Sequence, residues 1–171
     1  MDNDKEQAME YLSMFAKLIR QSLNASVENK ITLAEEISML RNYLELEKLR
    51  FKNSFDFRIK TSDQVTPEEI SLPPLLVQPY VENAVLHGMK TKKSDGLIEI
   101  LFEKNESGIL AITVVDNGIQ RSSTTAAKHK SLGMSITNKR LAYNNSVANK
   151  NFKVTPNYTE HGTTVRINVI L

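Results

Sequence analysis

Two consecutive amphipathic segments at the start of the chain constrain its fold more than any other feature. Apolar residues recur at spacings of three and four within residues 5–28, which predicts a helix with one apolar face. A second such pattern begins after a polar break, where Thr32 and Glu35 have the spacing of a capping box, and runs to about Arg50. Neither helix can bury its apolar face alone, so the pair predicts a helical hairpin or a coiled coil. The two apolar faces consist of Ala8, Leu12, Phe15 and Ile19, and of Leu33, Ile37, Leu40 and Leu44.

The pattern changes after residue 50. Alternating or continuous short apolar runs indicate strands, joined largely by hairpins. Pro73 and Pro74 predict the first turn of a helix that runs to Gly88, with Pro79 tightening or kinking it. These elements predict an α+β fold, a two-layer α/β sandwich with a mixed, mostly antiparallel sheet, preceded by amphipathic helices. The expected strands lie near 55–59, 97–103, 109–115, 152–158 and 163–170, and a further helix is expected over about 133–146.

Composition excludes several classes of function. Lys and Arg number 22 against 20 for Asp and Glu, so a net charge of +2 gives no electrostatic reason to expect a nucleic acid partner. The sequence contains no Cys, which excludes disulfides, thiolate zinc sites and Cys nucleophiles. No apolar run approaches the roughly 20 residues that a membrane helix needs, so we expect this polypeptide to be soluble by itself.

Three short motifs flank a long polar segment and carry candidate chemistry. In the first, Asn83 and His87 lie four residues apart on one face of the expected helix. An amide oxygen is a hard ligand suited to Mg²⁺, and a His can contact phosphate. Taken alone, the motif fits a polar helix face with a Gly cap at Gly88 at least as well.

The second and third motifs are equally ambiguous when each is taken alone. Asp116 ends a strand and can accept a hydrogen bond from an exocyclic amine, while Gly118 permits close approach of a ring; the alternative is an ordinary Asp-Asn-Gly turn. The run from Lys128 to Met134 leads into a helix whose free amide groups can bind phosphate. Its alternative is a solvated basic loop with a helix cap at Ser131.

The order of these motifs along the chain is more informative than any one of them. The motifs follow one another in a defined order: an Asn on a helix, an Asp-x-Gly at a strand end, a long polar segment, a Gly at a helix start, and Gly162-Thr163 before the last strand. This order resembles the Bergerat-type ATP-binding fold that histidine kinases share with gyrase, the Hsp90 chaperones and MutL, the GHKL superfamily. Within that set the chain is most similar to LytS-like sensor histidine kinases. The stretches that carry the resemblance are residues 43–51, 72–79, 82–88, 128–137 and 139–141.

The resemblance implies a two-component histidine kinase that uses ATP and Mg²⁺. Asn83 would coordinate the Mg²⁺ that bridges the ATP phosphates. Glu82 would support the metal or its waters, and His87 would lie near the phosphates. These three would be the catalytic residues. Residues 1–50 would be the later part of the dimerisation region, and residues 51–171 the ATP-binding catalytic domain.

The same resemblance implies how the nucleotide is held. Asp116 would accept a hydrogen from the adenine amino group, with Gly118 beneath the ring and Thr163 close to Asp116. Residues 119–132 would form the ATP lid, which ends near the phosphates. The remaining nucleotide-binding residues that the resemblance implies are Lys128, Lys130, Ser131, Leu132, Gly133 and Met134.

Two positions depart from the family pattern. Gln120 stands where the family usually has the second Gly of Asp-x-Gly-x-Gly, and Ser131 where it often has the first Gly of Gly-x-Gly. Both replace a residue that lets a hinge move, which bears on lid mobility and ATP affinity. Two alternatives therefore stand beside the kinase: a dimerisation or binding module with a decayed nucleotide site, and another ATPase or protein kinase of the GHKL superfamily.

The phosphoacceptor histidine of this class is absent from the sequence. The class carries it in a segment like Asn-Pro-His-Phe-Leu-Phe-Asn, and none of His87, His129 and His161 lies in such a segment. We therefore expect a fragment of a larger sensor that forms a homodimer and passes phosphoryl groups to a response regulator. The expected location is the cytoplasmic side of an inner membrane, with contact to the membrane only through segments upstream of Met1. This chain alone is expected to bind ATP without autophosphorylating.

Overall fold

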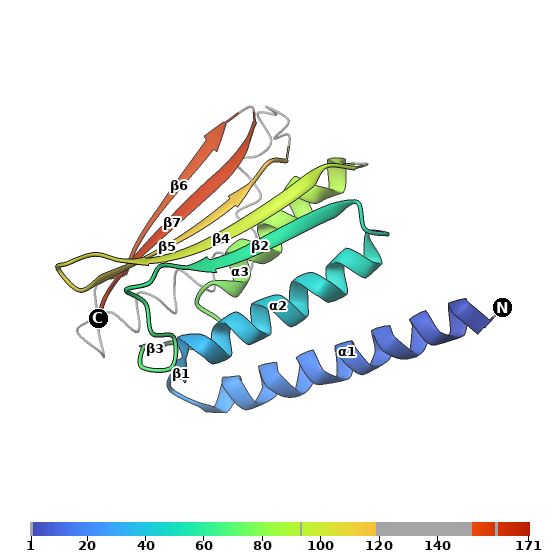
Figure 1. Cartoon of the computed structure of the whole chain (residues 1–171), viewed down its shortest axis with the longest axis horizontal. Helices are drawn as coiled ribbons and strands as arrows, with labels where there is room; N and C mark the ends of the chain where they lie inside the picture. The colour runs from blue at the N-terminus through green and yellow to red at the C-terminus, as the bar shows by residue number, and fades with distance from the viewer. Residues whose placement is uncertain (1, 93, 119–151, 160) are drawn as a thin grey trace.

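A sheet of five described strands, covered on one face by helices, forms the body of the protein (Figure 1). The structure is a computed structural model that describes residues 2–92, 94–118, 152–159 and 161–171. The expected helix over 133–146 lies outside these residues. The described elements are α1 (Asp2–Val27), β1 (Ile31–Thr32), α2 (Leu33–Arg50), β2 (Phe55–Thr61), β3 (Ser71–Leu72), α3 (Gln78–Asn83), the π-helical turn η1 (Ala84–Gly88), the 3₁₀ turn η2 (Met89–Thr91), β4 (Gly96–Lys104), β5 (Ile109–Asp116), β6 (Phe152–Thr159) and β7 (Gly162–Ile170).

The order of strands in the sheet is β2-β4-β5-β7-β6. Strands β2 and β4 are parallel, because α3 and its following turns form the crossover between them, and the other three pairs are antiparallel. The predicted α+β class and the mixed, mostly antiparallel sheet are therefore confirmed. A short antiparallel ladder of β1 with β3 was not predicted, since each strand is only two residues long.

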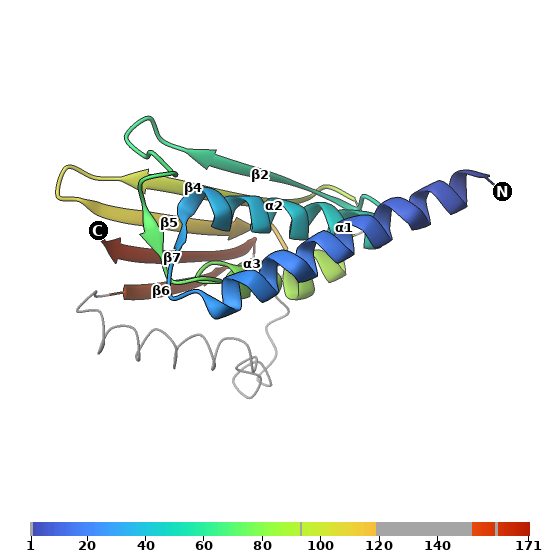
Figure 2. The same cartoon turned by 90° about the horizontal axis from the view of Figure 1, so that it is seen from below.

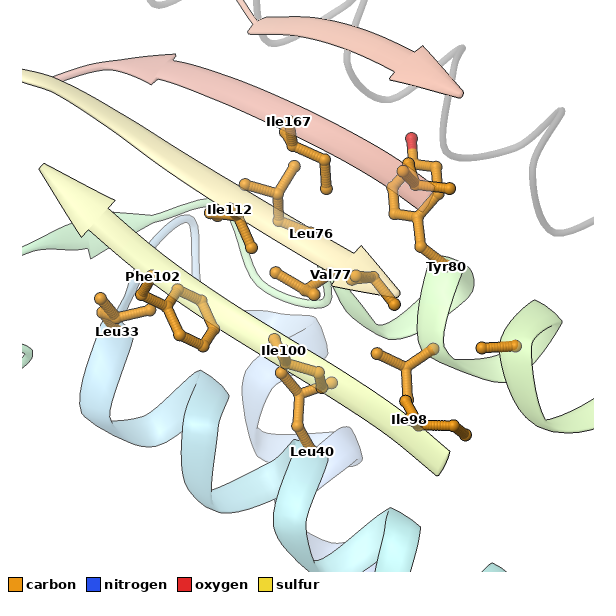
Figure 3. Packing of buried hydrophobic residues seen from close by; sticks show 14 of the residues in the cluster. Leu33, Leu40, Leu76, Val77, Tyr80, Ile98, Ile100, Phe102, Ile112 and Ile167 are labelled. Atoms are coloured by element: carbon orange, nitrogen blue, oxygen red, sulfur yellow. The ribbon is translucent and has the colours of Figure 1, made fainter. Parts of the chain in front are cut away.

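One hydrophobic core joins α2, α3 and the inner face of the sheet (Figure 3). Leu33, Leu40 and Leu44 of α2 are completely buried, and Ile100 and Phe102 of β4 are as well. The predicted apolar face of the second helix is therefore confirmed. Since α2 shares its core with the strands, the position of this helix is tied to the position of the sheet.

Helix α1 packs alongside α2 but leaves much of its apolar surface exposed (Figure 2). The contacts between the two helices include polar ones, such as a 2.7 Å hydrogen bond that Asn42 donates to Gln21. The large apolar residues with exposed side chains on α1 are Met9, Leu12, Phe15, Ile19, Leu23 and Val27. An exposed apolar face of this size indicates a surface that another protein segment covers. No described helix has the length and apolarity needed to cross a membrane.

The predicted helix start at Pro73 and Pro74 is wrong, although the capping box at Thr32 and Glu35 is confirmed. Residues 73–77 form a turn in which Leu75 has a left-handed φ of 58°, so no helix can run through them. Helix α3 begins only at Gln78, and Pro79 occupies its first turn, where a missing amide hydrogen has no cost. A side chain from α2 that the sequence analysis did not single out holds this turn.

That side chain is Glu36, a fully buried carboxylate. It accepts hydrogen bonds of 3.0 Å from the amide of Leu75 and 2.9 Å from the amide of Val77. Burial raises the pKa of Glu36 from 4.5 to about 7, and the backbone hydrogen bonds oppose this shift. A carboxyl group whose pKa is higher in the folded chain than in the unfolded chain stabilises the fold while it is protonated. This stabilisation is lost as rising pH removes the proton.

We therefore expect a pH-dependent difference in stability between the wild type and Glu36→Gln. As pH rises from about 4.5 to about 7, the window set by the pKa of Glu36, the unfolding free energy of the wild type should fall relative to the variant. The slope should reach at most about 1.4 kcal/mol per pH unit. Urea denaturation of both proteins across this window measures it, and a constant difference would contradict the prediction.

Candidate functional site

The site is centred on Asp116, the last residue of β5. The sheet register pairs Asp116 with Thr163 of β7 on one side and with Ile98 of β4 on the other. Asp116 and Thr163 are the buried polar residues of the sheet core, 6% and 9% exposed. The amide of Gly118 donates a 2.9 Å hydrogen bond to Oδ1 of Asp116. A carboxylate buried at a strand end with its donors already aligned is a fixed hydrogen-bond acceptor.

The charge on Asp116 is set by opposing effects. Burial raises the pKa of its carboxyl group, while hydrogen bonds from Gly118 and from the side chain and backbone of Thr163 lower it. The nearby His87 also lowers it. His87 comes from a different element, so the fold brings together four residues that the sequence predicted for one site: Asp116, Gly118, Thr163 and His87.

Three glycines allow the backbone to close around Asp116. A Cβ on Gly88 would lie 2.5 Å from Oδ1 of Asp116, and one on Gly118 would overlap the backbone of Gly88. A Cβ on Gly162, which has a φ of 142°, would overlap the backbone oxygen of Asp116. Backbone atoms cannot move aside as a flexible side chain can, so Gly118 and Gly162 require Gly. A side chain at Gly88 would instead displace the carboxylate of Asp116 from its hydrogen bonds. The sequence predicted that Gly118 permits close approach of a ligand ring. In the folded chain, the backbone of Gly88 lies next to it.

The helical segment that carries Glu82, Asn83 and His87 lies against this end of the sheet (Figure 1). Helix α3 ends at Asn83, and the next five residues form a π-helical turn that ends at Gly88. The sequence predicted a single helix to Gly88, tightened or kinked at Pro79, because no residue type marks a π turn. Such turns are frequent at functional sites. Glu82 and Asn83 are half-buried and His87 is exposed.

An acidic cluster beside Glu82 was missed in the sequence. Burial raises the pKa of Glu82, opposed by a 3.3 Å hydrogen bond that Gln78 donates to it. Burial likewise raises the pKa of Glu47 on α2, where Arg50 acts in the opposite direction and Glu82 adds to the rise. Burial, and then the charges of Glu47 and Glu82, raise the pKa of Tyr43. The spacings of four and three between Tyr43, Glu47 and Arg50 were the available signal, since they place the three on one helix face.

Part of the predicted site lies outside the described residues. This applies to the lid over 119–132, to the departures at Gln120 and Ser131, and to the remaining predicted nucleotide contacts. Those contacts are Lys128, Lys130, Ser131, Leu132, Gly133 and Met134.

Two hollows on the described surface lie at the other end of the β4–β5 ladder from Asp116. They measure ≈ 310 and ≈ 410 Å³, and Lys104 lines both. Lys104 pairs with Leu110, six positions along β4 from the Ile98–Asp116 pair. The residues that line the two hollows are mainly exposed or half-buried and include no buried polar group. Neither hollow is therefore a stronger candidate for a binding site than the surroundings of Asp116.

Among the described residues, no group of three or more acidic or histidine side chains could hold a metal by itself. Mg²⁺ is usually held by one or two protein groups together with phosphate oxygens and waters. The half-buried amide of Asn83 fits that kind of donor set, in which a nucleotide supplies the other ligands. The cradle around Asp116 adds a buried, fixed hydrogen-bond acceptor at the end of β5.

The chain has relatives among known proteins. Residues 1–55 match the family model described as histidine kinase. The chain is 28% identical over 166 residues to the sensor protein LytS of Staphylococcus epidermidis, covering 97% of this chain and 27% of that protein. It is 33% identical over 115 residues to the sensor histidine kinase/phosphatase LytS of Staphylococcus aureus, covering 67% of this chain and 19% of that protein. The chain thus spans about a quarter of the length of such relatives, or less.

Solved structures share the fold. The histidine kinase domain of the blue-light activated histidine kinase of Erythrobacter litoralis has a TM-score of 0.60 at 17% identity, covering 94% of this chain and 75% of that one. The histidine kinase ThkA, in complex with the response regulator TrrA, has a TM-score of 0.56 at 17% identity, covering 94% of this chain and 48% of that one. At this level of identity the likeness concerns the fold.

The fold is therefore that of the catalytic domain of histidine kinases, a GHKL domain. The sequence matches then narrow the class, because the two LytS alignments cover 97% and 67% of this chain and the histidine kinase family model covers residues 1–55. The chain belongs to the LytS-like sensor histidine kinases and comprises their catalytic, ATPase-type region.

Proposed function

We propose that this chain binds ATP with Mg²⁺ and supports transfer of the γ-phosphoryl group to a histidine that lies outside it. A response regulator would then receive the phosphoryl group. The observation that carries the proposal is the buried Asp116 carboxylate with its aligned donors and three close glycines. A fixed acceptor in a tight backbone cradle suits the edge of a flat base that carries an amino group.

The base would bind on the sheet side of the site. Asp116 would accept a hydrogen bond from the adenine amino group, and Thr163 would keep the carboxylate in place, as it already bonds to it. Gly118 would lie next to the ring. His87 would lie toward the phosphates, which its exposed position permits.

The phosphates would bind on the helix side. Asn83 would supply an oxygen to Mg²⁺, and Glu82 would orient a water bound to the metal. Lys128 and Lys130 of the lid would add positive charge, and the segment ending at Gly133 would add backbone amides. When bound, Mg²⁺ neutralises charge that develops on the transferred phosphoryl group. The contribution of the chain itself is to bind and orient the nucleotide.

The exposed apolar face of α1 supports the proposal of a homodimer in the full-length protein. Leu12 and Phe15, 63% and 44% exposed, lie near the middle of that face. A response regulator is the second proposed partner, and the near-balanced charge of the chain gives no support to a nucleic acid as a partner.

We further propose that the full-length protein is a membrane-tethered sensor with this region in the cytoplasm, where ATP is available. The helices up to residue 50 would belong to its dimerisation region, and residues 51–171 to its catalytic domain.

Calorimetry with a non-hydrolysable ATP analogue tests nucleotide binding. We expect saturable heat in the presence of Mg²⁺ and weaker binding when EDTA removes the metal, because Asn83 would lose its bridge to the phosphates. GTP serves as the control nucleotide, since guanine has a carbonyl where adenine has its amino group. Absence of heat and of a thermal shift at millimolar nucleotide would favour a decayed site and a binding module instead.

We predict that the 171-residue chain does not autophosphorylate. In-line transfer requires an acceptor nitrogen within about 3–3.5 Å of the phosphoryl group. His87 would act as a binding group beside the nucleotide, and His129 would lie in the lid. His161 lies in the turn before β7 and not on a helix. Incubation with labelled ATP followed by acid and base treatment measures the outcome. An acid-labile, base-stable label on this chain would contradict the prediction. A label that appears only after addition of a chain carrying the acceptor segment would agree with it.

A further inference from the structure

The buried carboxylate of Glu36 connects the helical part of the chain to the helix that carries Asn83. Glu36 lies on α2, and its two oxygens bond to the amides of Leu75 and Val77, about forty positions further along the chain. The exposed fraction of the residue is 0%. A buried ionisable group is costly unless its bonds are satisfied, so its presence here indicates a specific role for these bonds.

The turn that Glu36 holds would not keep its shape by local interactions alone. Leu75 has a φ of 58°, a left-handed conformation that is unfavourable for a residue other than Gly. Val77, the residue before α3, has no side-chain cap for the helix. Glu36 therefore supplies, from another element, the acceptor for the amide of the N-cap residue Val77 that the Glu of a capping box would supply locally.

The same turn also contacts the helical hairpin. The side chain of Leu75 packs against a small cluster of Ala25 from α1, Ile31 from β1 and Met39 from α2. The turn is thus fixed to α1 and α2 by an apolar contact and by a buried carboxylate. A change in the position of the hairpin would be transmitted to the turn.

Beyond the turn, the path to the nucleotide site is short and rigid. The carbonyl of Val77 accepts bonds from Tyr80 and Val81, which belong to the first turns of α3. Val77, Val81 and Val85 have no exposed surface, so this segment has little freedom to shift within the core. Asn83 is the last residue of α3, and Gly88, five residues on, touches Asp116.

We propose that Glu36 is a positioning residue for the nucleotide site: by fixing the start of α3 to α2, it sets where Asn83 stands relative to Asp116. This inference rests on the proposed function, since it concerns the same site. Loss of the bonds from Glu36 would then shift the start of α3 and change metal-dependent nucleotide binding. The adenine acceptor, which is held by the sheet, would stay in place.

The substitution Glu36→Gln tests this role with little change in volume. A carboxylate offers acceptors to both amides, whereas the amide group of Gln would direct an N–H toward one of them. The start of α3 would lose one of its two anchors. Glu45→Gln is the matched control, because Glu45 is an exposed residue of the same helix.

The quantity to measure is the gain in affinity for a non-hydrolysable ATP analogue when Mg²⁺ replaces EDTA. Calorimetry measures it at one pH above the pKa of Glu36, where its carboxyl group is ionised. We expect Glu36→Gln to reduce this gain about fivefold or more, and to change the affinity in EDTA by less than about twofold. Glu45→Gln should leave both unchanged. A purely structural role for Glu36 would lower the melting temperature and leave the gain as in the wild type.

The outcomes separate the two proposals. If the wild type binds with a gain from Mg²⁺ and Glu36→Gln keeps that gain, or loses both affinities in parallel, the positioning role is wrong and the proposed function stands. If the wild type binds no nucleotide, the proposed function is wrong, and the positioning role is wrong with it.

A measurement on the wild type decides the question if Glu36→Gln does not fold. Coupling between two sites is reciprocal, so nucleotide with Mg²⁺ should strengthen the bonds of Glu36. We expect amide exchange at Leu75 and Val77 to slow more with Mg²⁺ nucleotide than with nucleotide in EDTA. Gly108, whose amide bonds to Asn105 in the β4–β5 turn, is the reference position. Equal slowing at all three amides would overturn the inference.

Discussion

Replacing Asp116 by Asn should weaken binding of adenine nucleotides by roughly 5- to 150-fold, which corresponds to about 1–3 kcal/mol for an unsatisfied buried group. In the wild type, Gly118 and Thr163 already donate to this carboxylate, so under the proposed function its remaining acceptor capacity would serve the adenine amino group. An Asn that keeps its oxygen toward Gly118 turns its NH₂ toward the adenine amine, and two donors then face each other. Calorimetry with the same analogue and Mg²⁺ measures the loss.

The control for this prediction is Asp56→Asn, because Asp56 is an exposed Asp at the start of β2 that pairs with Lys48. That variant should bind as the wild type does. Melting temperatures of all three proteins show whether Asp116→Asn remains folded. A folded Asp116→Asn protein with unchanged affinity would show that Asp116 does not contact the base.

Replacing Gly118 by Ala should destabilise the fold by about 3 kcal/mol, at the upper end of the range for overpacking. The new Cβ would overlap Cα and the carbonyl group of Gly88, which are backbone atoms in a buried contact. The helical turn that ends at Gly88 would have to move away from β5, and this would also move His87. Urea denaturation measures the loss of stability, and nucleotide calorimetry at low temperature measures the effect on the site.

The variant Gly108→Ala is the control, because it introduces backbone strain without steric overlap of the new Cβ. Gly108 has a φ of 76° and no atom within 4 Å of the position of a Cβ, so only strain acts there. Its replacement should cost about 1 kcal/mol. If Gly118→Ala is no more destabilising than Gly108→Ala, the close packing of Gly118 on Gly88 is not important for stability.

Local patterns predicted much of the architecture correctly. The alternation of Phe55, Phe57 and Ile59 lies in β2, and the capping box at Thr32 marks the start of α2. These predictions succeeded because period and capping depend on neighbours close in the chain. Asp116, Gly118 and Thr163 were also singled out, and the antiparallel pairing of β5 with β7 brings them together.

Other features depended on contacts between distant segments. Pro73 and Pro74 have the local signature of a helix start, yet the bonds from Glu36 and the left-handed Leu75 delay the helix to Gln78. The proximity of Glu47 to Glu82 likewise arises only when α2 and α3 pack on the same face of the sheet. Neither feature has a signal within its own segment, because the groups involved are more than thirty positions apart.

The sequence by itself determined the long helices and the five strands of the main sheet, the α+β class and the residue types available at the proposed nucleotide site, since these follow from local periodicity and side-chain chemistry. The tertiary structure alone decided which of those residues meet. It placed Gly88 against Gly118 and Asp116, and Glu36 beneath the turn before α3. The physical reason is that burial and hydrogen bonding between distant segments outweigh local preference wherever a polar group must be satisfied inside the core.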